Sequence, residues 1–348
     1  MKGLRIGTHL IGERAPCFLV AEIGINHNGS PDLARKMIDA AADAGADGVK
    51  FQNYRTEDFI LDRSLTYRYP SRGGWVTESQ YEMFKRCELD RRALQELKEH
   101  CDRRGVVFHS TPTSPAGVRD LVEIGTKVLK NGSDFLTHLD LIEHMGRSGV
   151  PTVLSTGMAT LAEIEEAVRV FRKTGNDGLI LLHCVSSYPT PPEDTHLRKI
   201  PALAAAFDCL VGFSDHTSGT AAAIGAVVLG ACWLEKHFTL DRSLPGPDHA
   251  FSSDPEEFGC LVRAVRDVEK CLGTSRLALT TKELESRRDF RLSCVAAGDL
   301  ACGHRIREED VVFRRPGTGL PPSCLPLLVG RILRKDVAIG EVIRWADI

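Results

Sequence analysis

The chain has 348 residues, of which 43% are hydrophobic and 26% charged, and its formal net charge is -3. This composition is typical of a folded globular protein and excludes a largely disordered chain. The slight negative charge argues against binding to nucleic acid or to a membrane surface, because either requires a concentrated excess of Lys and Arg. We expect a folded enzyme or binding protein, with one large domain and a smaller one.

The cysteines and the apolar runs indicate the compartment. The 11 cysteines are scattered without a C-x-x-C pair, which disfavours a zinc ribbon, a thioredoxin-like motif and a complete disulfide framework. The first residues contain no long apolar stretch, and no segment approaches the roughly 18 consecutive apolar residues of a membrane span. We therefore expect a cytoplasmic protein.

Short apolar or β-branched runs alternate with helix-period segments from residue 18 to about residue 272. This alternation predicts parallel strands joined by crossover helices. Ser30 and Pro31 form a helix start, and Ile164, Val168 and Phe171 share one helix face. The predicted strands are Phe18–Ile23, Gly48–Phe51, Val106–His109, Lys127–Lys130, Thr152–Ser155, Leu179–Cys184, Cys209–Phe213 and Trp233–Phe238. This is the strand number of a closed (β/α)8 TIM barrel, which we assign to residues 1–272.

One stretch of the predicted barrel, Asn53–Tyr81, breaks the alternation. It is rich in Tyr, Arg, Gly and Ser and is longer than a usual connection between a strand and the following helix. It is either a functional insertion or a solvated excursion, and the sequence favours neither.

The chain after residue 272 predicts a second, smaller domain. The polar segment 273–288 is typical of a linker, and residues 289–348 contain an internal repeat. The pattern D-[LV]-x-x-G-x-x-I-R-x-x-D-[VI] begins at Asp299 and again at Asp336. Two copies predict a small pseudo-symmetric, β-rich module, because a solenoid needs at least three repeats.

Polar residues stand at the carboxyl end of nearly every predicted strand. These ends converge on one face of a closed barrel, where unusual polar side chains indicate catalysis. A single buried polar residue of this kind is more often structural, but so many on one face favour an active site. They are Glu22, Asn26, His27, Lys50, Gln52, Ser110, Thr111, Lys130, Ser133, Ser155, Thr156, Ser186, Tyr188, Ser214, Asp215, His216, Glu235, Lys236 and His237.

Two histidines and two lysines suggest what this face binds. His216 and His237 end neighbouring strands, and imidazole is a common ligand of divalent transition metals. Lys50 and Lys130, among many hydroxyl groups, fit a phosphate and a carboxylate. Because the nucleotide-binding loops G-x-x-x-x-G-K-[ST] and G-x-G-x-x-G are both missing, a small phosphorylated acid is the favoured ligand.

Several blocks of the sequence resemble the sialic acid synthase family. They are A-E-I-G-I-N-H-N-G from Ala21, K-F-Q from Lys50, S-T-G-M from Ser155, G-F-S-D-H-T from Gly212, E-K-H-F from Glu235, and G-P-D-H-A-F-S from Gly246. The segment R-P-G-T-G from Arg315 resembles part of the antifreeze-like (SAF) domain that ends members of this family. The likeness runs in order along almost the whole chain.

The resemblance implies that phosphoenolpyruvate and water condense with an N-acylated amino sugar, giving a nine-carbon 2-keto sugar acid and phosphate. It implies a divalent metal at His216 and His237, with Mn2+ favoured over Mg2+ or Co2+. The implied catalytic residues are Glu22, Lys50, Lys130 and Asp248. The implied substrate-binding residues are Gln52, Ser110, Thr111, Ser133, Ser155, Ser186, Tyr188, Ser214, Asp215, Phe290 and Arg315. In a domain-swapped homodimer, Phe290 and Arg315 would cap the sugar bound by the other subunit.

The residues and the resemblance together leave the acceptor open. It is free or 6-phosphorylated N-acetylmannosamine, or a dideoxy-diamino sugar that leads to legionaminic or pseudaminic acid. Three other functions are less favoured: a synthase that acts on a sugar phosphate, a metal-dependent hydrolase, and a non-catalytic ice- or glycan-binding protein. The SAF-like tail argues against the first, the small number of metal ligands against the second, and the intact polar strand ends against the third.

Overall fold

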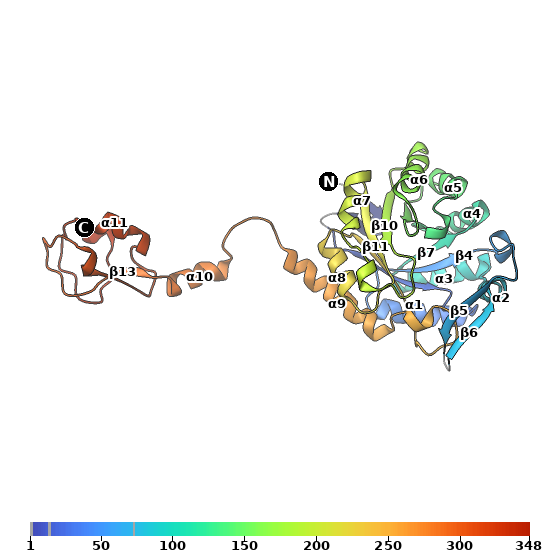
Figure 1. Ribbon diagram of the computed structural model, residues 1–348, viewed down its shortest axis with the longest axis horizontal. Coiled ribbons are helices and arrows are strands. Elements are labelled where there is room, and N and C mark those ends of the chain that lie inside the picture. Colours follow the sequence, from blue (N-terminus) through green and yellow to red (C-terminus); the bar gives the residue numbers. More distant parts are fainter. Residues whose placement is uncertain (1–2, 13–14, 72–73) are drawn as a thin grey trace. The chain divides into compact units, whose positions relative to one another are not determined.

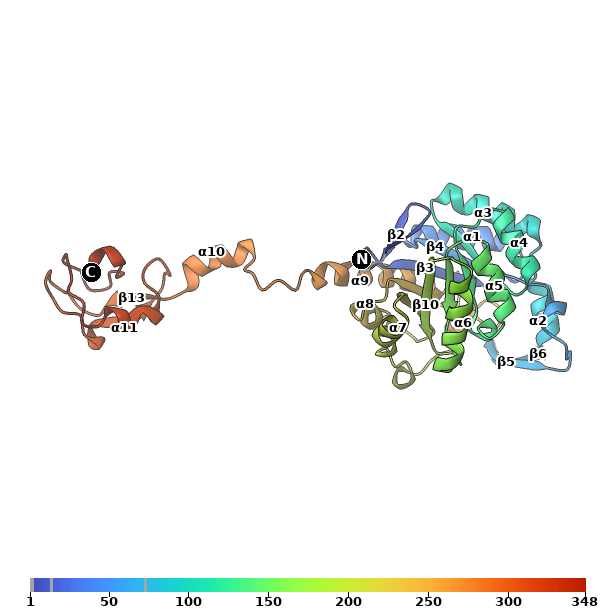
Figure 2. The same cartoon turned by 90° about the horizontal axis from the view of Figure 1, so that it is seen from above.

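The computed structural model describes residues 3–12, 15–71 and 74–348. The chain divides into two compact units, Met1–Gly273 and Thr274–Ile348. Figures 1 and 2 show strands ringed by helices in the first unit, and a smaller unit built largely of loops at the C-terminus. No helix in the described ranges is both long and apolar enough to cross a membrane.

The first unit is a closed barrel of eight parallel strands, in which β12 pairs with β3 to complete the ring. The strands are β3 (Phe18–Gly24), β4 (Gly48–Asn53), β7 (Val107–Pro112), β8 (Leu129–Asn131), β9 (Thr152–Ser155), β10 (Leu179–Cys184), β11 (Leu210–Asp215) and β12 (Trp233–His237). Each coincides with a predicted strand to within a few residues at its ends, so the predicted TIM barrel is confirmed.

Helices follow the strands and cover the outside of the barrel (Figure 2). They are α1 (Pro31–Asp43), α3 (Arg91–Arg104), α4 (Pro115–Glu123), α5 (Leu139–Arg147), α6 (Leu161–Lys173), α7 (Lys199–Phe207), α8 (Ala221–Val228) and α9 (Pro255–Leu272). The predicted start of α1 is confirmed, because the Ser30 hydroxyl accepts a hydrogen bond from Leu33 N at 3.3 Å.

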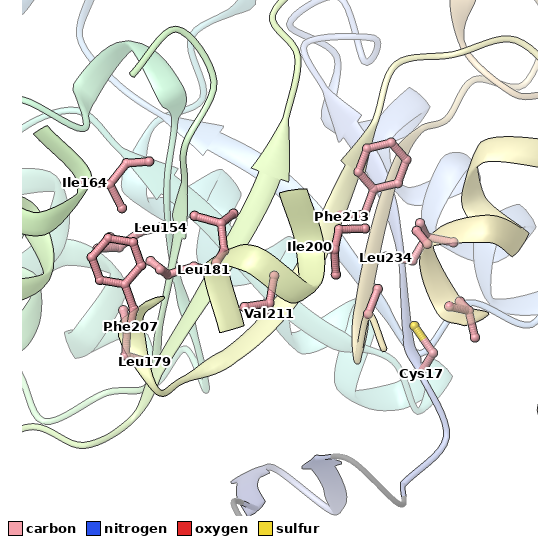
Figure 3. Close-up of a cluster of buried hydrophobic side chains, with 14 of the residues drawn as sticks. Cys17, Leu154, Ile164, Leu179, Leu181, Ile200, Phe207, Val211, Phe213 and Leu234 are labelled. Carbon is pink, nitrogen blue, oxygen red and sulfur yellow. The ribbon is translucent and has the colours of Figure 1, made fainter. Parts of the chain in front are cut away.

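The outer faces of the strands pack against the apolar faces of these helices. Leu154, Leu181 and Val211 on the strands meet Ile164 and Ile200 on α6 and α7, as Figure 3 shows. Each buried aliphatic side chain of this kind stabilises the fold by roughly 1.5–3 kcal/mol. Since successive side chains of a strand alternate, the outward apolar set leaves the remaining residues pointing into the barrel.

Inside the barrel, an apolar cluster fills the end at which the strands begin. The N-terminal hairpin of β1 (Gly3–Ile6) and β2 (His9–Gly12) adds Ile6 and Ile11 to this cluster, where they meet inward residues such as Phe18 and Trp233. The ring of Phe18 stacks on that of Trp233 at 4.5 Å between centroids. The polar inward residues therefore gather at the opposite, carboxyl end of the strands.

The stretch that broke the alternation folds into ordered elements. It contains the short helix η1 (Thr56–Asp58) and the antiparallel pair β5 (Thr66–Ser71) and β6 (Gly74–Ser79), and leads directly into α2 (Gln80–Cys87). Figure 1 shows β5, β6 and α2 together at one side of the barrel. Because several of its side chains line the cavity described below, it is more than a solvated excursion.

The C-terminal unit contains β13 (Ser293–Ala296), β14 (Val311–Arg314) and α11 (Leu325–Leu328). Its two repeats contact each other reciprocally: the Asp299 carboxylate accepts from Ile339 N, and the Asp336 carboxylate accepts from Cys302 N, both at 2.7 Å. This exchange confirms a pseudo-symmetric module.

The segment 273–288, predicted as a linker, contains most of helix α10 (Thr281–Phe290). The helix begins with a capping box, in which Glu283 N donates to the Thr280 hydroxyl at 3.2 Å and Thr280 N donates to the Glu283 carboxylate at 2.7 Å. Hydrophobic periodicity in the sequence did not predict this helix, because none of its residues is buried within the unit. The pattern T-x-x-E was the available sequence signal.

Candidate active site

A cavity of about 640 Å³ opens at the carboxyl ends of the barrel strands. Strand ends and the loops that follow them form its floor, and the stretch between β4 and α3 forms one wall. Thirteen of the predicted site residues line it: Glu22, Lys50, Gln52, Thr111, Lys130, Ser133, Ser155, Ser186, Tyr188, Ser214, His216, His237 and Asp248. The fold thus brings together residues that are up to 226 positions apart in the chain, from Glu22 to Asp248.

Four buried charged groups form the floor of this cavity. The Lys50 ammonium lies 3.1 Å from a Glu22 carboxylate oxygen and 2.9 Å from one of Glu235, and the Lys130 ammonium lies 3.7 Å from the same Glu235 oxygen. All four side chains are at most 7% exposed. Barrel register explains the cluster, because Glu22 pairs with Lys50 across β3 and β4, and alternation places Glu235 on the same inner face.

Burial and neighbouring charges shift the pKa values of Glu22 and Glu235 in opposite directions. Burial, reinforced by Glu235 and opposed by Lys50, raises the pKa of Glu22 to about 7. Burial also acts to raise the pKa of Glu235, but Lys130 and Lys50 outweigh it and lower that pKa to about 2. Burial lowers the pKa of Lys130, whereas for Lys50 the two carboxylates overcome burial and raise it. Glu22 is therefore the floor group that can exchange a proton near neutral pH.

Hydroxyl groups converge beside the lysines. Ser133 donates to Ser155 at 3.0 Å and accepts from Gly157 N at 3.1 Å. A Cβ at Gly157 would lie 2.5 Å from the Ser186 hydroxyl, so only glycine permits this close approach. The hydroxyls of Thr111 and Ser186 are buried without a hydrogen-bond partner among the described residues. Buried polar groups are normally paired, so these donors mark a place for a polar ligand.

His216 and His237 form an imidazole pair at one side of the floor, with ring centroids 5.4 Å apart. The Nδ1 atom of His216 lies 2.8 Å from the carbonyl oxygen of Val185; a proton on this nitrogen leaves the lone pair of Nε2 for a metal. Burial lowers the pKa of His237 well below its ordinary value, which keeps that ring neutral as metal ligation requires. For His216, burial is outweighed by the contacts with Cys184 and Val185, which raise its pKa, so a divalent cation held by this pair would displace a proton from that ring.

The imidazole pair would fill only part of the coordination shell of a metal ion. Over the residues the structure describes, no three His, Cys, Asp or Glu side chains are grouped as ligands of one metal ion. Asp248 is the nearest acid, with its carboxylate 3.7 Å from His237 Nδ1, and burial raises its pKa to about 6. The Tyr188 ring contacts that of His216 in a tilted arrangement at 4.2 Å between centroids, and that of Phe251 at 5.3 Å. Oxygen atoms of a substrate or of water would have to complete a metal shell.

Two predicted substrate-binding residues point away from the cavity. Ser110 pairs with Phe51 in register and faces the outer layer, whereas its neighbour Thr111 faces inward with Gln52. Asp215 is buried, and its carboxylate accepts from Lys236 Nζ at 2.7 Å and from Thr217 N at 2.9 Å. Neither residue lines the cavity, and their assignment as substrate-binding residues stays a prediction. The physical reason is the period of two in a strand, which sends adjacent residues to opposite faces.

Phe290 and Arg315 belong to the C-terminal unit. The Arg315 guanidinium lies 5.3 Å from the centroid of the Phe290 ring, so the two residues predicted to cap the sugar do lie together. Their role in capping a partner's site stays a prediction.

Sequence reasoning left other lining residues without a role. Glu235 was recognised as a strand-end residue, yet its ion pairs with both lysines depend on barrel closure and have no local signal. Cys184 ends β10 and lies 3.9 Å from His216 Nδ1. The aromatic residues Tyr54, Phe59 and Phe84 come from the irregular stretch and from α2. The density of aromatic residues in this part of the sequence was the one available signal for them.

Comparison with known proteins identifies the family. Residues 37–276 match the model of the NeuB family, and residues 293–348 match that of the SAF domain. The chain belongs to the NeuB family. The resemblance to sialic acid synthases, including the C-terminal SAF domain, is thereby confirmed.

Three relatives show which kinds of protein this NeuB family member is similar to. It is 38% identical over 341 residues to the N,N'-diacetyllegionaminic acid synthase of Legionella pneumophila, with 97% of this chain and 96% of the relative covered. It is 34% identical over 330 residues to the pseudaminic acid synthase of Campylobacter jejuni serotype O:2, covering 95% and 96%. The crystal structure of the sialic acid synthetase of Leptospira borgpetersenii in complex with citrate matches with a TM-score of 0.74 at 35% identity, covering 82% of this chain and 95% of that one. All three names support a synthase.

Proposed function

We propose that this NeuB family member condenses phosphoenolpyruvate with an N-acylated amino sugar and water, releasing a nine-carbon 2-keto sugar acid and phosphate. The observation that carries the proposal is the buried cluster of Lys50, Lys130, Glu22 and Glu235 beside a pair of imidazoles. Two relatives named as synthases of legionaminic and pseudaminic acid support the same reaction class.

Phosphoenolpyruvate would bind against the two lysines. Its phosphate and carboxylate need several cationic and hydroxyl donors, and Lys50 and Lys130 supply the charge. The unpaired hydroxyls of Thr111 and Ser186, with Ser133, Ser155 and Ser214 nearby in the lining, supply the remaining donors. Ammonium groups fixed in a buried site also stabilise the negative charge that develops as phosphate leaves.

The reaction makes one carbon–carbon bond and one carbon–oxygen bond, and it breaks the carbon–oxygen bond to phosphate. The methylene carbon of phosphoenolpyruvate attacks the aldehyde carbon of the open sugar, and the aldehyde oxygen takes up one proton that derives from the water to become a hydroxyl group. Water adds to the central carbon of the former phosphoenolpyruvate; the bond to the phosphate oxygen then breaks, the second proton of the water leaves with the phosphate, and a ketone remains. Glu22 accepts the proton of that water, a role for which its pKa of about 7 is suited.

The metal would occupy the imidazole pair of His216 and His237, with Mn2+ as the first candidate. When bound there, a divalent cation supplies Lewis acidity toward the aldehyde oxygen. Asp248, with its pKa raised to about 6, and Tyr188 adjoin these rings and would orient the sugar. The proposal includes a domain-swapped homodimer, in which Arg315 and Phe290 cap the sugar bound by the partner. This arrangement would supply a cover for the cavity.

The direct test is release of inorganic phosphate from phosphoenolpyruvate by the full chain with Mn2+ and an N-acylated amino sugar. We expect release that requires the sugar, stops with a chelator and returns when Mn2+ is restored. His237→Ala should lose both this activity and Mn2+ binding measured by titration calorimetry. Hydrolysis of phosphoenolpyruvate at the same rate without any sugar would instead support a hydrolase.

A further inference from the structure

A buried histidine lies below the floor of the cavity. His109 on β7 is fully buried and pairs in register with Lys50, so its side chain faces the barrel interior. Thr111, two positions further along the same strand, lines the cavity. On its other side, the His109 ring meets that of Trp233 edge to face, with centroids 5.5 Å apart. His109 therefore lies between the apolar cluster and the charged floor.

Several polar atoms of this layer have no partner in the chain. Both ring nitrogens of His109, Nε1 of Trp233 and Oε2 of Glu235 are buried without a hydrogen bond to any described residue. The other carboxylate oxygen of Glu235, Oε1, is the one that lies 2.9 Å from the Lys50 ammonium and 3.7 Å from that of Lys130. Because buried polar groups are normally paired, these atoms mark an enclosed polar site under the floor.

The chemical types of these atoms complement one another. Burial lowers the pKa of His109 to about 3, so the neutral ring has a donor on one nitrogen and an acceptor on the other. The carboxylate of Glu235 can only accept and the indole of Trp233 can only donate. Water does both, and a buried water typically makes about three hydrogen bonds. Since none of these groups bonds directly to another, water is the molecule that can join them.

We infer that His109 is a positioning residue: through enclosed water it holds the free oxygen of Glu235 and so fixes this carboxylate between Lys50 and Lys130. The inference rests on the proposed condensation, in which the two ammonium groups bind phosphoenolpyruvate and stabilise the departing phosphate. A carboxylate held by one oxygen alone can rotate and carry both ammonium groups with it. The indole of Trp233 adds a donor to the same water, and its loss leaves the link from His109 to Glu235 in place.

A high-resolution crystal structure of the full chain tests the link directly. We expect water within about 2.7–3.2 Å of a ring nitrogen of His109 and of Glu235 Oε2. In the structure of His109→Phe this water should be lost, and the Glu235 carboxylate should adopt more than one orientation. A dry site, or a His109 ring whose nitrogens face away from Glu235, overturns the inference whatever the activity of the chain.

Two substitutions of His109 test its effect on the lysines. His109→Phe keeps an aromatic ring without hydrogen-bonding atoms, whereas His109→Gln keeps a donor and an acceptor. We expect His109→Phe to lower kcat/KM for phosphoenolpyruvate by roughly 10–100-fold, the scale of one hydrogen bond to a charged group. The loss should include a raised KM for phosphoenolpyruvate with the KM for the sugar unchanged, and His109→Gln should recover most of it.

A histidine outside the barrel provides the matched control. His100 on α3 has its Nε2 atom 2.8 Å from the Asp39 carboxylate, so His100→Phe also removes a partly buried hydrogen bond. This variant should lower the melting temperature and leave both KM values unaltered. Destabilisation alone reduces the number of active molecules and does not change KM, so the two variants separate positioning from folding.

Binding of phosphoenolpyruvate without any sugar, measured by titration calorimetry, separates this inference from the proposed function. His109→Phe should bind phosphoenolpyruvate about tenfold more weakly than the natural chain does, and His100→Phe should bind it equally well. Equal binding by His109→Phe and the natural chain, or an unaltered KM, overturns the positioning role. Failure to release phosphate with every acceptor overturns the proposed function, while the crystal structure and this titration still decide on His109.

Discussion

The two ends of the barrel interior differ, although the same strands build both. At the first end, Val20 and Trp233 pack in an apolar cluster closed by the N-terminal hairpin. Two residues further along the same strands, Glu22 and Glu235 face Lys50 in a cavity. Apolar burial at the first end stabilises the fold, whereas the second end keeps buried charges and unpaired hydroxyls that cost stability. The contrast separates residues that hold the barrel together from residues that are available for chemistry.

Removing the proton acceptor at the polar end should have the largest effect. Glu22→Gln keeps the shape of the side chain but cannot accept a proton, so we expect turnover to fall by roughly 100–10,000-fold with the fold intact. Phosphate release and thermal unfolding measure the two quantities. Glu82→Gln on the exposed face of α2 is the matched control. Full turnover by Glu22→Gln would exclude this residue as the base.

Truncation at the apolar end should instead affect stability. Trp233 is fully buried, and Trp233→Ala should lower the free energy of unfolding by about 3–5 kcal/mol. Denaturant titration measures this change, and Trp75→Ala, whose side chain is 64% exposed, should change it by about 0.5 kcal/mol or less. Activity per folded Trp233→Ala molecule should stay close to that of the natural chain. A large loss of that specific activity would break the distinction between the two ends.

The pH dependence should follow the raised pKa of Glu22. Because its carboxylate form is the base, kcat/KM should rise about tenfold per pH unit below pH 7 and level off above it. The same shift has a stability consequence: the folded state retains the proton from pH 4.5 to about 7, so the contribution of Glu22 to stability falls as pH rises through that window. Glu22→Gln should remove this dependence. If kcat/KM of Glu22→Gln kept the same rise with pH, that rise would belong to another titrating group.

The smallest effect is expected at Ser110, which faces outward beside the inward-facing Thr111. Thr111→Ala removes an inward hydroxyl that has no hydrogen-bond partner in the described part of the chain, and it should raise KM for phosphoenolpyruvate by up to about tenfold. Ser110→Ala changes the neighbouring residue on the outer face of the same strand and should leave KM unaltered. Steady-state kinetics on both variants gives the comparison. Equal effects would mean that Ser110 reaches the substrate after all.

The period of hydrophobic residues was sufficient to find all eight barrel strands. Polar residues at the strand ends located the face that carries the candidate active site, and the repeat from Asp299 and Asp336 located the pseudo-symmetric module. The strand signals are local, since each depends on residues a few positions apart, and the repeat is visible when two segments of the sequence are compared. The helix α10 was missed because it lacks an apolar stripe, although its capping box is visible in the sequence.

The sequence by itself determined the eight barrel strands of this protein and the chemical types of residue at their ends. Only the tertiary structure decided which neighbour of each pair enters the cavity, as Thr111 does and Ser110 does not. It also decided that Glu235 joins both lysines and that Tyr54, Phe59 and Phe84 line the same cavity. The reason is physical: side-chain direction follows from strand register, and ion pairs between distant residues exist only once the barrel has closed.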